Sequence, residues 1–176
     1  PENFAFEKVS FDQYYSLSYL SQLGITTTNN QALSTYDIQA ELYLPSGYKG
    51  PAYLLYPNFN VIMTWNLSKS YALSVGLLAN KLVGANGLEF LKGEQALKNR
   101  FSYKEMKNLQ SQLNTLGFET GKPDGIWGPK SRDAIRSFQL AHQLIADGYP
   151  NTALFSKIKS VLDKSEEKTT KIDYQG

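Results

Sequence analysis

A short segment in the first half of the chain gathers side chains that can bind a sugar. Trp65, Asn66, Ser68 and Tyr71 lie within two helical turns of each other, beside a predicted bend between two helices. The amide of Asn66 can pair with the acetamido group of an N-acetyl sugar while an aromatic ring covers the sugar face. We therefore predict that these side chains point into a common cleft.

Composition excludes several other kinds of site. The chain of 176 residues is 41% hydrophobic and 19% charged, with a formal charge of only +2, which argues against a nucleic-acid partner. It has no cysteine and a single histidine, His142, so thiolate chemistry and a multi-histidine metal site are excluded. We expect no cofactor and no metal. No stretch approaches the roughly 20 apolar residues that cross a bilayer, and Pro1 is interpreted as a cut end.

The elements that must position the sugar-binding segment are mixed α and β. Apolar residues recur at helical spacing from Phe11 to Leu23, and Gly24 is a typical C-terminal cap. Residues 38–44 alternate between apolar and polar, which predicts a half-buried strand with Glu41 on its polar face. Residues 52–56 can pair with this strand, so we predict a β-hairpin.

Two helices are predicted on either side of the segment itself. The first runs from Asn58 to Trp65 with Asn58 as its cap, and the second from Lys69 to Val83. Glycines and mixed charges then predict a linker over residues 84–101. The first unit accordingly spans 1–83.

The second half is predicted to be entirely helical. Apolar faces recur in residues 104–116, 131–142 and 152–162, which defines a unit over 102–163. The polar residues 164–176 are expected to form a flexible tail. No internal repeat is found. The expected fold class is mainly α with a small β-hairpin, followed by an all-α unit of three helices.

Two Asp-Gly turns separate these three helices. They are Asp124-Gly125 and Asp147-Gly148. The carboxylate of Asp124 can accept a hydrogen bond from the backbone two residues on, so we expect loop architecture there. Trp127 follows as either a core plug or a sugar-stacking platform.

The ordered series of motifs in this half resembles the widespread three-helix peptidoglycan-binding domain, over Phe101–Leu162. The matching positions are Leu109-Gln110, Leu113, Leu116-Gly117-Phe118, Asp124-Gly125-Ile126-Trp127-Gly128, Ala134-Ile135, Phe138-Gln139 and Asp147-Gly148. The resemblance implies binding of cell-wall glycan or its peptide stems. Trp127, Arg132 and Arg136 are the candidate contacts: the arginines are expected to be solvated, and either could pair with a stem-peptide carboxylate.

The first half is similar to the membrane-bound lytic murein transglycosylase B family over Phe11–Leu82. The matching positions are Leu23-Gly24-Ile25, Leu44-Pro45-Ser46-Gly47, Gly50-Pro51-Ala52, Pro57-Asn58-Phe59, Trp65-Asn66, Ser68 and Tyr71-Ala72. The resemblance implies the tail of a lysozyme-like catalytic domain. It also implies that Trp65, Asn66, Ser68 and Tyr71 bind substrate in a glycan cleft.

The same resemblance implies that the catalytic residue is missing. Family chemistry uses a single glutamic acid, well upstream of this signature, to cleave the MurNAc–GlcNAc β-1,4 bond with a 1,6-anhydromuramyl product. Glu41 is expected on a polar strand face, and the remaining candidates lie in the linker or before any ordered pattern; these are Glu2, Glu7, Glu89 and Glu94. We therefore predict no catalytic residue in this chain.

Three interpretations follow. The leading one is a fragment of a lytic transglycosylase whose partners are glycan strands, stem peptides and the missing N-terminal part of its own catalytic domain. The second is a non-catalytic wall-binding protein. The third is another wall hydrolase such as an amidase, which the absence of a histidine-rich zinc set disfavours. The expected location is the bacterial periplasm or cell envelope, with outer-membrane anchoring an option for the full-length protein.

Overall fold

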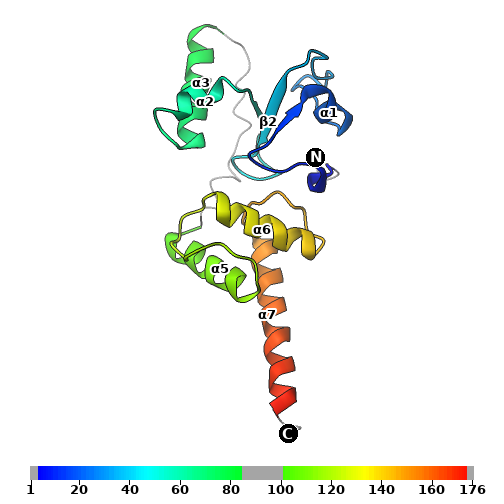
Figure 1. Ribbon diagram of the computed structural model, residues 1–176, viewed down its shortest axis with the longest axis vertical. Coiled ribbons are helices and arrows are strands. Elements are labelled where there is room, and N and C mark those ends of the chain that lie inside the picture. The colour runs from blue at the N-terminus through cyan, green and yellow to red at the C-terminus, as the bar shows by residue number, and fades with distance from the viewer. Residues whose placement is uncertain (1–3, 85–100, 174–176) are drawn as a thin grey trace. The chain divides into compact units, whose positions relative to one another are not determined.

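The chain divides into two compact units, unit 1 over Pro1–Ala96 and unit 2 over Leu97–Gly176. The computed structural model describes residues 4–84 and 101–173, with side chains up to residue 165 (Figure 1). The linker predicted over 84–101 therefore lies almost entirely outside the described residues.

Unit 1 is built on an antiparallel sheet of three strands in the order β1-β2-β3. The strands are β1 (Tyr14–Ser16), β2 (Gln39–Tyr43) and β3 (Tyr53–Leu55). The predicted hairpin is confirmed as β2 and β3, in which Glu41 lies opposite Leu55. On its other side β2 pairs with β1, where Glu41 lies opposite Tyr14.

The strand β1 was not predicted, because its residues belong to the stretch assigned to a helix. The observed helix α1 covers only Leu17–Gln22, and the hydroxyl of Ser16 accepts a hydrogen bond from the backbone N–H of Tyr19 at 3.2 Å. A side-chain cap at Ser16 fixes the helix start there. The residues before it pair with β2 instead, so backbone pairing across the sheet outweighs the local helical spacing.

The central strand is more buried than its alternating sequence predicts. Glu41 is only 5% exposed and Tyr43 also 5%, so both faces of β2 are covered and the half-buried assignment is wrong. An aromatic segment before the sheet adds to the core of this unit. It includes the 3-10 helix Phe6–Lys8, and its buried members are Phe4, Phe6, Val9 and Phe11.

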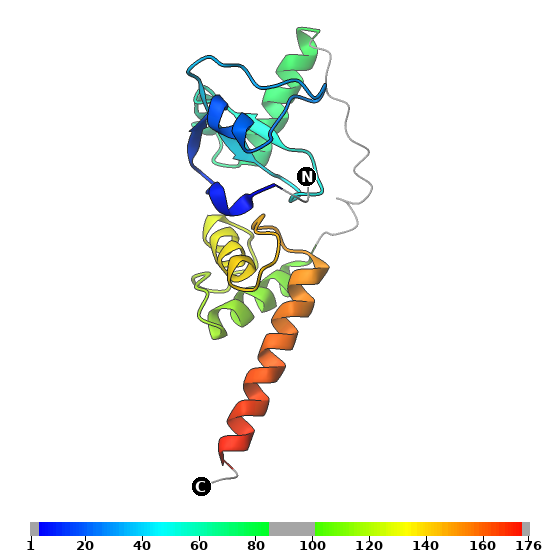
Figure 2. The same ribbon diagram turned by 90° about the vertical axis from the view of Figure 1, so that its right-hand side faces the viewer.

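Two helices follow the sheet, α2 (Phe59–Met63) and α3 (Lys69–Leu82), and they lie side by side (Figures 1 and 2). Asn58 is the N-cap residue of α2, as predicted, but its side chain makes no capping hydrogen bond. The hydroxyl of Ser68 caps α3 by accepting from the backbone N–H of Tyr71. The segment between residues 56 and 71 therefore contains α2 and the turns on either side of it.

Unit 2 consists of α5 (Tyr103–Thr115), α6 (Pro129–Ala141) and α7 (Thr152–Asp173). A capping box of Ser102 and Glu105 starts α5, and the hydrogen bonds from Ser102 lower the pKa of the Glu105 carboxyl. The buried core draws on all three helices: Met106, Leu109, Leu113, Ala134, Ile135, Phe138, Leu154 and Ile158. The last helix runs to Asp173, so most of the tail predicted over 164–176 is helical, and in both ribbon views it extends beyond α5 and α6.

Candidate functional site

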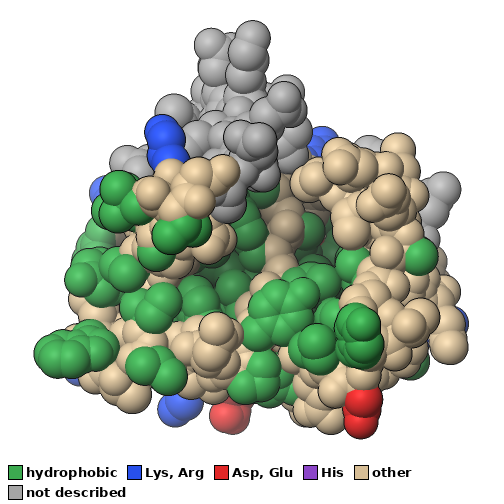
Figure 3. Space-filling view, turned by 90° about the horizontal axis from the view of Figure 1, so that it is seen from above, with side chains coloured by type: hydrophobic (Ala, Val, Ile, Leu, Met, Phe, Trp, Pro, Cys, Tyr) green, Lys and Arg blue, Asp and Glu red, His purple; other side chains and the backbone are tan. Residues whose placement is uncertain are grey.

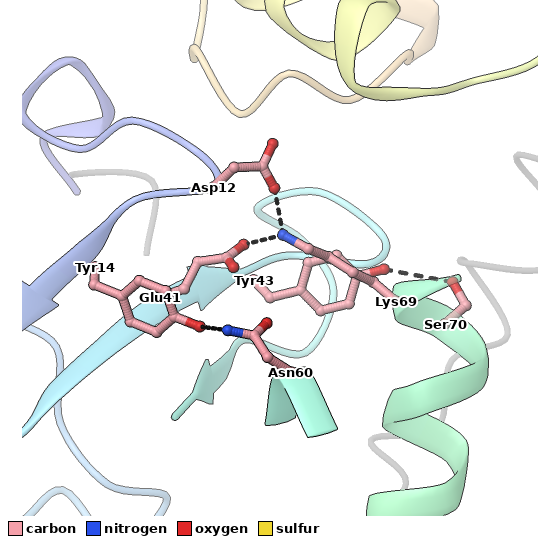
Figure 4. A network of polar contacts seen from close by, with 7 residues as sticks. All are labelled: Asp12, Tyr14, Glu41, Tyr43, Asn60, Lys69 and Ser70. Carbon is pink, nitrogen blue, oxygen red and sulfur yellow. Dashed lines mark hydrogen bonds and ion pairs between the residues drawn. The ribbon is translucent and has the colours of Figure 1, made fainter. Parts of the chain in front are cut away.

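The start of α3 is tied to the sheet by an ion-pair cluster (Figure 4). The ammonium of Lys69 contacts the carboxylates of both Asp12 and Glu41, and it lies 5.7 Å from the ring centroid of Tyr43. The side chain of Glu41 is 7% exposed, that of Lys69 24% and that of Asp12 46%. A buried carboxylate is stable beside a cation, so Lys69 explains why Glu41 can lie inside.

The protonation of Lys69 follows from these neighbours. Burial lowers the pKa of its ammonium, but the hydrogen bonds and negative charges of Asp12 and Glu41 outweigh this effect, and the net pKa is raised. Lys69 is therefore charged throughout the neutral range. Glu41 had been assigned to a solvated strand face, and that assignment is corrected by this contact.

Two neutral hydrogen bonds join the same elements. The amide of Asn60 in α2 donates to the hydroxyl of Tyr14 in β1 at 3.0 Å. The hydroxyls of Tyr43 in β2 and Ser70 in α3 lie 3.4 Å apart. Figure 4 shows that both contacts flank the Lys69 cluster. Both helices are thus attached to the sheet through polar groups.

Of the predicted sugar-binding residues, Trp65, Asn66 and Ser68 lie on the turn between α2 and α3, and Tyr71 lies in the first turn of α3. The side-chain oxygen of Asn66 accepts from the backbone N–H of Ser68 at 3.0 Å, and Ser68 in turn caps α3. Asn66 therefore orders the residue that caps the helix and is not itself the cap. Trp65 is 87% exposed and Tyr71 48% exposed, so both rings are open to a ligand.

Exposed apolar side chains extend from this turn along α2 and α3. Besides Trp65 and Tyr71, the exposed ones on α2, α3 and their flanks are Val61, Leu67, Val75, Leu78, Leu82 and Val83. A space-filling view shows apolar side chains spread over this end of unit 1, with a hollow among them (Figure 3). So many neighbouring apolar groups exceed the scattered exposure of an ordinary surface, which indicates a binding face.

In unit 2, each Asp-Gly turn is held by a buried glutamine. The amide nitrogen of Gln110 donates to Asp124 at 2.9 Å, and its oxygen accepts from the backbone N–H of Gly125 at 2.7 Å. Asp124 also accepts from the N–H of Ile126, as expected for loop architecture, and the bonds from Gln110 and Ile126 lower its pKa. Gly125 has a φ of +74°, and a Cβ there would lie 2.7 Å from the backbone oxygen of Tyr103.

The second turn repeats this arrangement. Gln139 donates to Asp147 at 2.9 Å, accepts from Gly148 at 2.8 Å, and Asp147 accepts from Tyr149 at 3.0 Å. We call these two arrangements the Gln-Asp-Gly clamps. They form an internal structural repeat, so the expectation of no repeat is wrong. Both glutamines were among the positions that match the peptidoglycan-binding resemblance, but no role was assigned to either; each directly follows an apolar core residue of its helix.

The two turns meet through their aromatic residues. The rings of Trp127 and Tyr149 pack edge to face with centroids 5.2 Å apart, and Trp127 also packs against the core of unit 2. Its indole N–H is buried and has no acceptor among the described residues. These contacts favour Trp127 as a core plug.

The two arginines expected to be solvated differ from that expectation. Arg132 is 7% exposed, and its guanidinium lies 5.4 Å from the centroid of the Trp127 ring. A delocalised cation that stacks on an aromatic face tolerates burial, which the sequence pattern does not reveal. Arg136 is half-buried. His142 packs on Phe138, and burial together with Lys157 lowers its pKa.

The comparisons with known proteins agree with the resemblance predicted for each half of the chain. Residues 1–80 match the transglycosylase SLT domain, and residues 102–158 match the peptidoglycan binding domain. The chain therefore joins a transglycosylase SLT domain to a peptidoglycan-binding domain. Such domains act on peptidoglycan and imply association with the cell envelope.

Crystal structures of SltB3 from Pseudomonas aeruginosa are similar to this chain. They were solved in complex with NAG-anhNAM-pentapeptide and with NAG-NAM-pentapeptide. In both cases the TM-score is 0.77 at 33% identity, covering 90% of this chain and 42% of SltB3. The chain therefore spans less than half of SltB3, and the match supports a mostly helical, lysozyme-like fold with a small sheet for the transglycosylase part.

A curated wall protein matches a smaller part. The N-acetylmuramoyl-L-alanine amidase CwlM of Mycobacterium tuberculosis is 34% identical over 83 residues, which is 42% of this chain and 20% of CwlM. None of the helices among the described residues could span a bilayer. Nor do the described residues form a group of three or more side chains able to hold a metal.

Proposed function

We propose that this chain is the C-terminal part of a lytic transglycosylase of the bacterial periplasm, and that unit 2 holds the wall polymer during cleavage. The parent enzyme would cleave the MurNAc–GlcNAc β-1,4 bond and leave a 1,6-anhydromuramyl end. The observation that carries this proposal is the order of the two domains, a transglycosylase domain over 1–80 followed by a peptidoglycan-binding domain over 102–158. SltB3, which is similar over 90% of the chain, was crystallised with an anhydro-sugar ligand.

The proposal places the catalytic acid outside this chain. A general acid must carry a proton when it meets the glycosidic oxygen. Glu41, the buried glutamate of unit 1, has its carboxylate engaged by the ammonium of Lys69. Glu7 lies exposed in the 3-10 helix. Neither suits the role, which also supports the alternative of a non-catalytic peptidoglycan-binding protein.

The proposed glycan contacts in unit 1 are Trp65, Asn66, Ser68 and Tyr71. The two exposed rings would cover sugar faces. The oxygen of Asn66 is engaged by the N–H of Ser68, so its amide nitrogen is the group that would donate to the acetamido carbonyl. Because the hydroxyl of Ser68 caps α3, Ser68 would shape the glycan-binding surface more than it would hydrogen-bond the sugar. In unit 2, Arg136 would contact the wall polymer near the half-buried Trp127 ring, and Arg132 would support that ring.

A matched pair of substitutions separates the glycan role of Asn66 from its turn role. Asn66→Asp keeps the oxygen that accepts from Ser68 but removes the amide donor. We expect it to weaken binding of chitotetraose about ten-fold, the value of one good hydrogen bond, with little change in Tm. The measurement is an NMR titration of the 176-residue chain, followed through the indole N–H of Trp65.

The control is Ser68→Ala, which removes the helix cap and leaves the Asn66 amide in place. It should cost about 1 kcal/mol of stability and change the affinity less than Asn66→Asp does. An Asn66→Asp chain that binds chitotetraose as tightly as the parent would remove Asn66 from the glycan site.

A further inference from the structure

Lys69 occupies the point at which three parts of unit 1 meet. It is the first residue of α3 and directly follows the Ser68 cap. Its ammonium reaches Glu41 in the central strand and Asp12 in the turn before β1, as Figure 4 shows. No other described residue of α3 makes an ion pair with the sheet or with that turn.

The turn that carries Trp65 and Asn66 is ordered mostly by its own bonds. Asn66 holds Ser68, and Ser68 holds the N–H of Tyr71, so these contacts join the turn only to the start of α3. They fix its shape but not its direction relative to the sheet. That direction depends on contacts that leave the turn, and Lys69 supplies two of them.

The Lys69 contacts are the strongest of those that link α2 and α3 to the sheet. The hydroxyls of Tyr43 and Ser70 are 3.4 Å apart, at the outer limit of a hydrogen bond, and Asn60–Tyr14 is a neutral bond on an exposed pair. Hydrogen bonds between ionised groups are about twice as strong as neutral ones. They are also directional, whereas apolar packing at the buried Ala72 is not.

We propose that Lys69 is a positioning residue for glycan binding: its bridge to Glu41 and Asp12 sets the orientation of the Trp65–Tyr71 turn on the sheet. This inference rests on the proposed glycan site. Glu41 is the principal partner, since its side chain is only 7% exposed and the pair is little screened by water. Asp12, whose side chain is 46% exposed, contributes less.

The test compares three variants of the 176-residue chain by NMR titration with chitotetraose, well below Tm. Lys69→Gln should weaken binding about ten-fold and shift the indole signal of Trp65 in the free protein. Lys69→Arg keeps the charge and the reach, and should restore the affinity to within about three-fold of the parent. Asp12→Asn should have the smallest effect, because its pair is exposed.

Loss of Lys69 leaves Glu41 buried without its cation, so Lys69→Gln could unfold unit 1. The double variant Lys69→Met/Glu41→Met removes both charges and keeps side chains of similar length. In this folded background, a ten-fold loss of affinity supports the inference. Parent-like affinity in it, or in a folded Lys69→Gln chain, overturns the inference and leaves the glycan site intact. Failure of the unsubstituted chain to bind chitotetraose overturns the glycan site itself, and the inference with it.

Discussion

Gln139→Ala is expected to lower the free energy of unfolding of unit 2 by about 3 kcal/mol, and the matched Gln110→Ala by about 1 kcal/mol. Both substitutions break the two hydrogen bonds of a Gln-Asp-Gly clamp, and Gln110→Ala also removes a bond to the hydroxyl of Ser131. The two variants differ in how buried the aspartate is that loses its glutamine partner. Asp147 is 1% exposed, so its carboxylate and the N–H of Gly148 lose a partner away from water. Asp124 is exposed, and water can replace the lost bond there.

Hydrogen exchange of the α6 backbone amides in the full chain measures this difference, because these amides open with unit 2. Circular dichroism at low temperature checks that both variants still fold. Equal losses of protection in the two variants would show that burial of the carboxylate does not set the cost.

The second expected result is a complete absence of product. Purified peptidoglycan incubated with the 176-residue chain should release no 1,6-anhydromuropeptides detectable by mass spectrometry. This result follows from the proposal that the catalytic acid lies outside this chain, because Glu41, the buried glutamate of unit 1, is engaged by Lys69. An active lytic transglycosylase digesting the same peptidoglycan in parallel serves as the positive control.

Anhydromuropeptides released by the chain, and lost on Glu41→Gln, would contradict this account. Glu41 would then be the acid, despite its ammonium neighbour. Products that persist in Glu41→Gln would instead point to another carboxyl group. Either outcome would reject the proposal that the catalytic acid lies outside this chain.

Much of unit 2 could be predicted from the sequence because its signals are local. Apolar spacing located α5, α6 and the first part of α7 to within a few residues. The Asp-Gly dipeptides indicated tight turns, and the bond from Ile126 N–H to Asp124 was the one expected. Such features depend on residues close together in the chain.

The errors concern contacts between residues far apart in the chain. No residue near Glu41 in the sequence indicates its contact with Lys69, which follows it by 28 positions. The alternation of apolar and polar residues alone therefore predicted a solvent-exposed carboxylate. Strand β1 exists because β2 pairs with it, and Arg132 is buried because the Trp127 ring covers it. The spacing of apolar residues along the sequence cannot predict contacts between residues so far apart.

The missed repeat has a different cause. The two clamps use the same residue types, but Gln110 precedes Asp124 by 14 positions whereas Gln139 precedes Asp147 by only 8. A search at one fixed period passes over such a pair. The available signal was the recurrence of an apolar residue followed by Gln, at 109–110 and 138–139, each upstream of an Asp-Gly turn.

The most direct test of the central claim, that this chain holds the wall polymer, is co-sedimentation with insoluble peptidoglycan. The 176-residue chain is mixed with purified peptidoglycan or with an equal mass of cellulose, and the pellet and supernatant are quantified after centrifugation. We predict that the chain moves into the pellet with peptidoglycan and stays in the supernatant with cellulose. The same distribution with both polymers would contradict it.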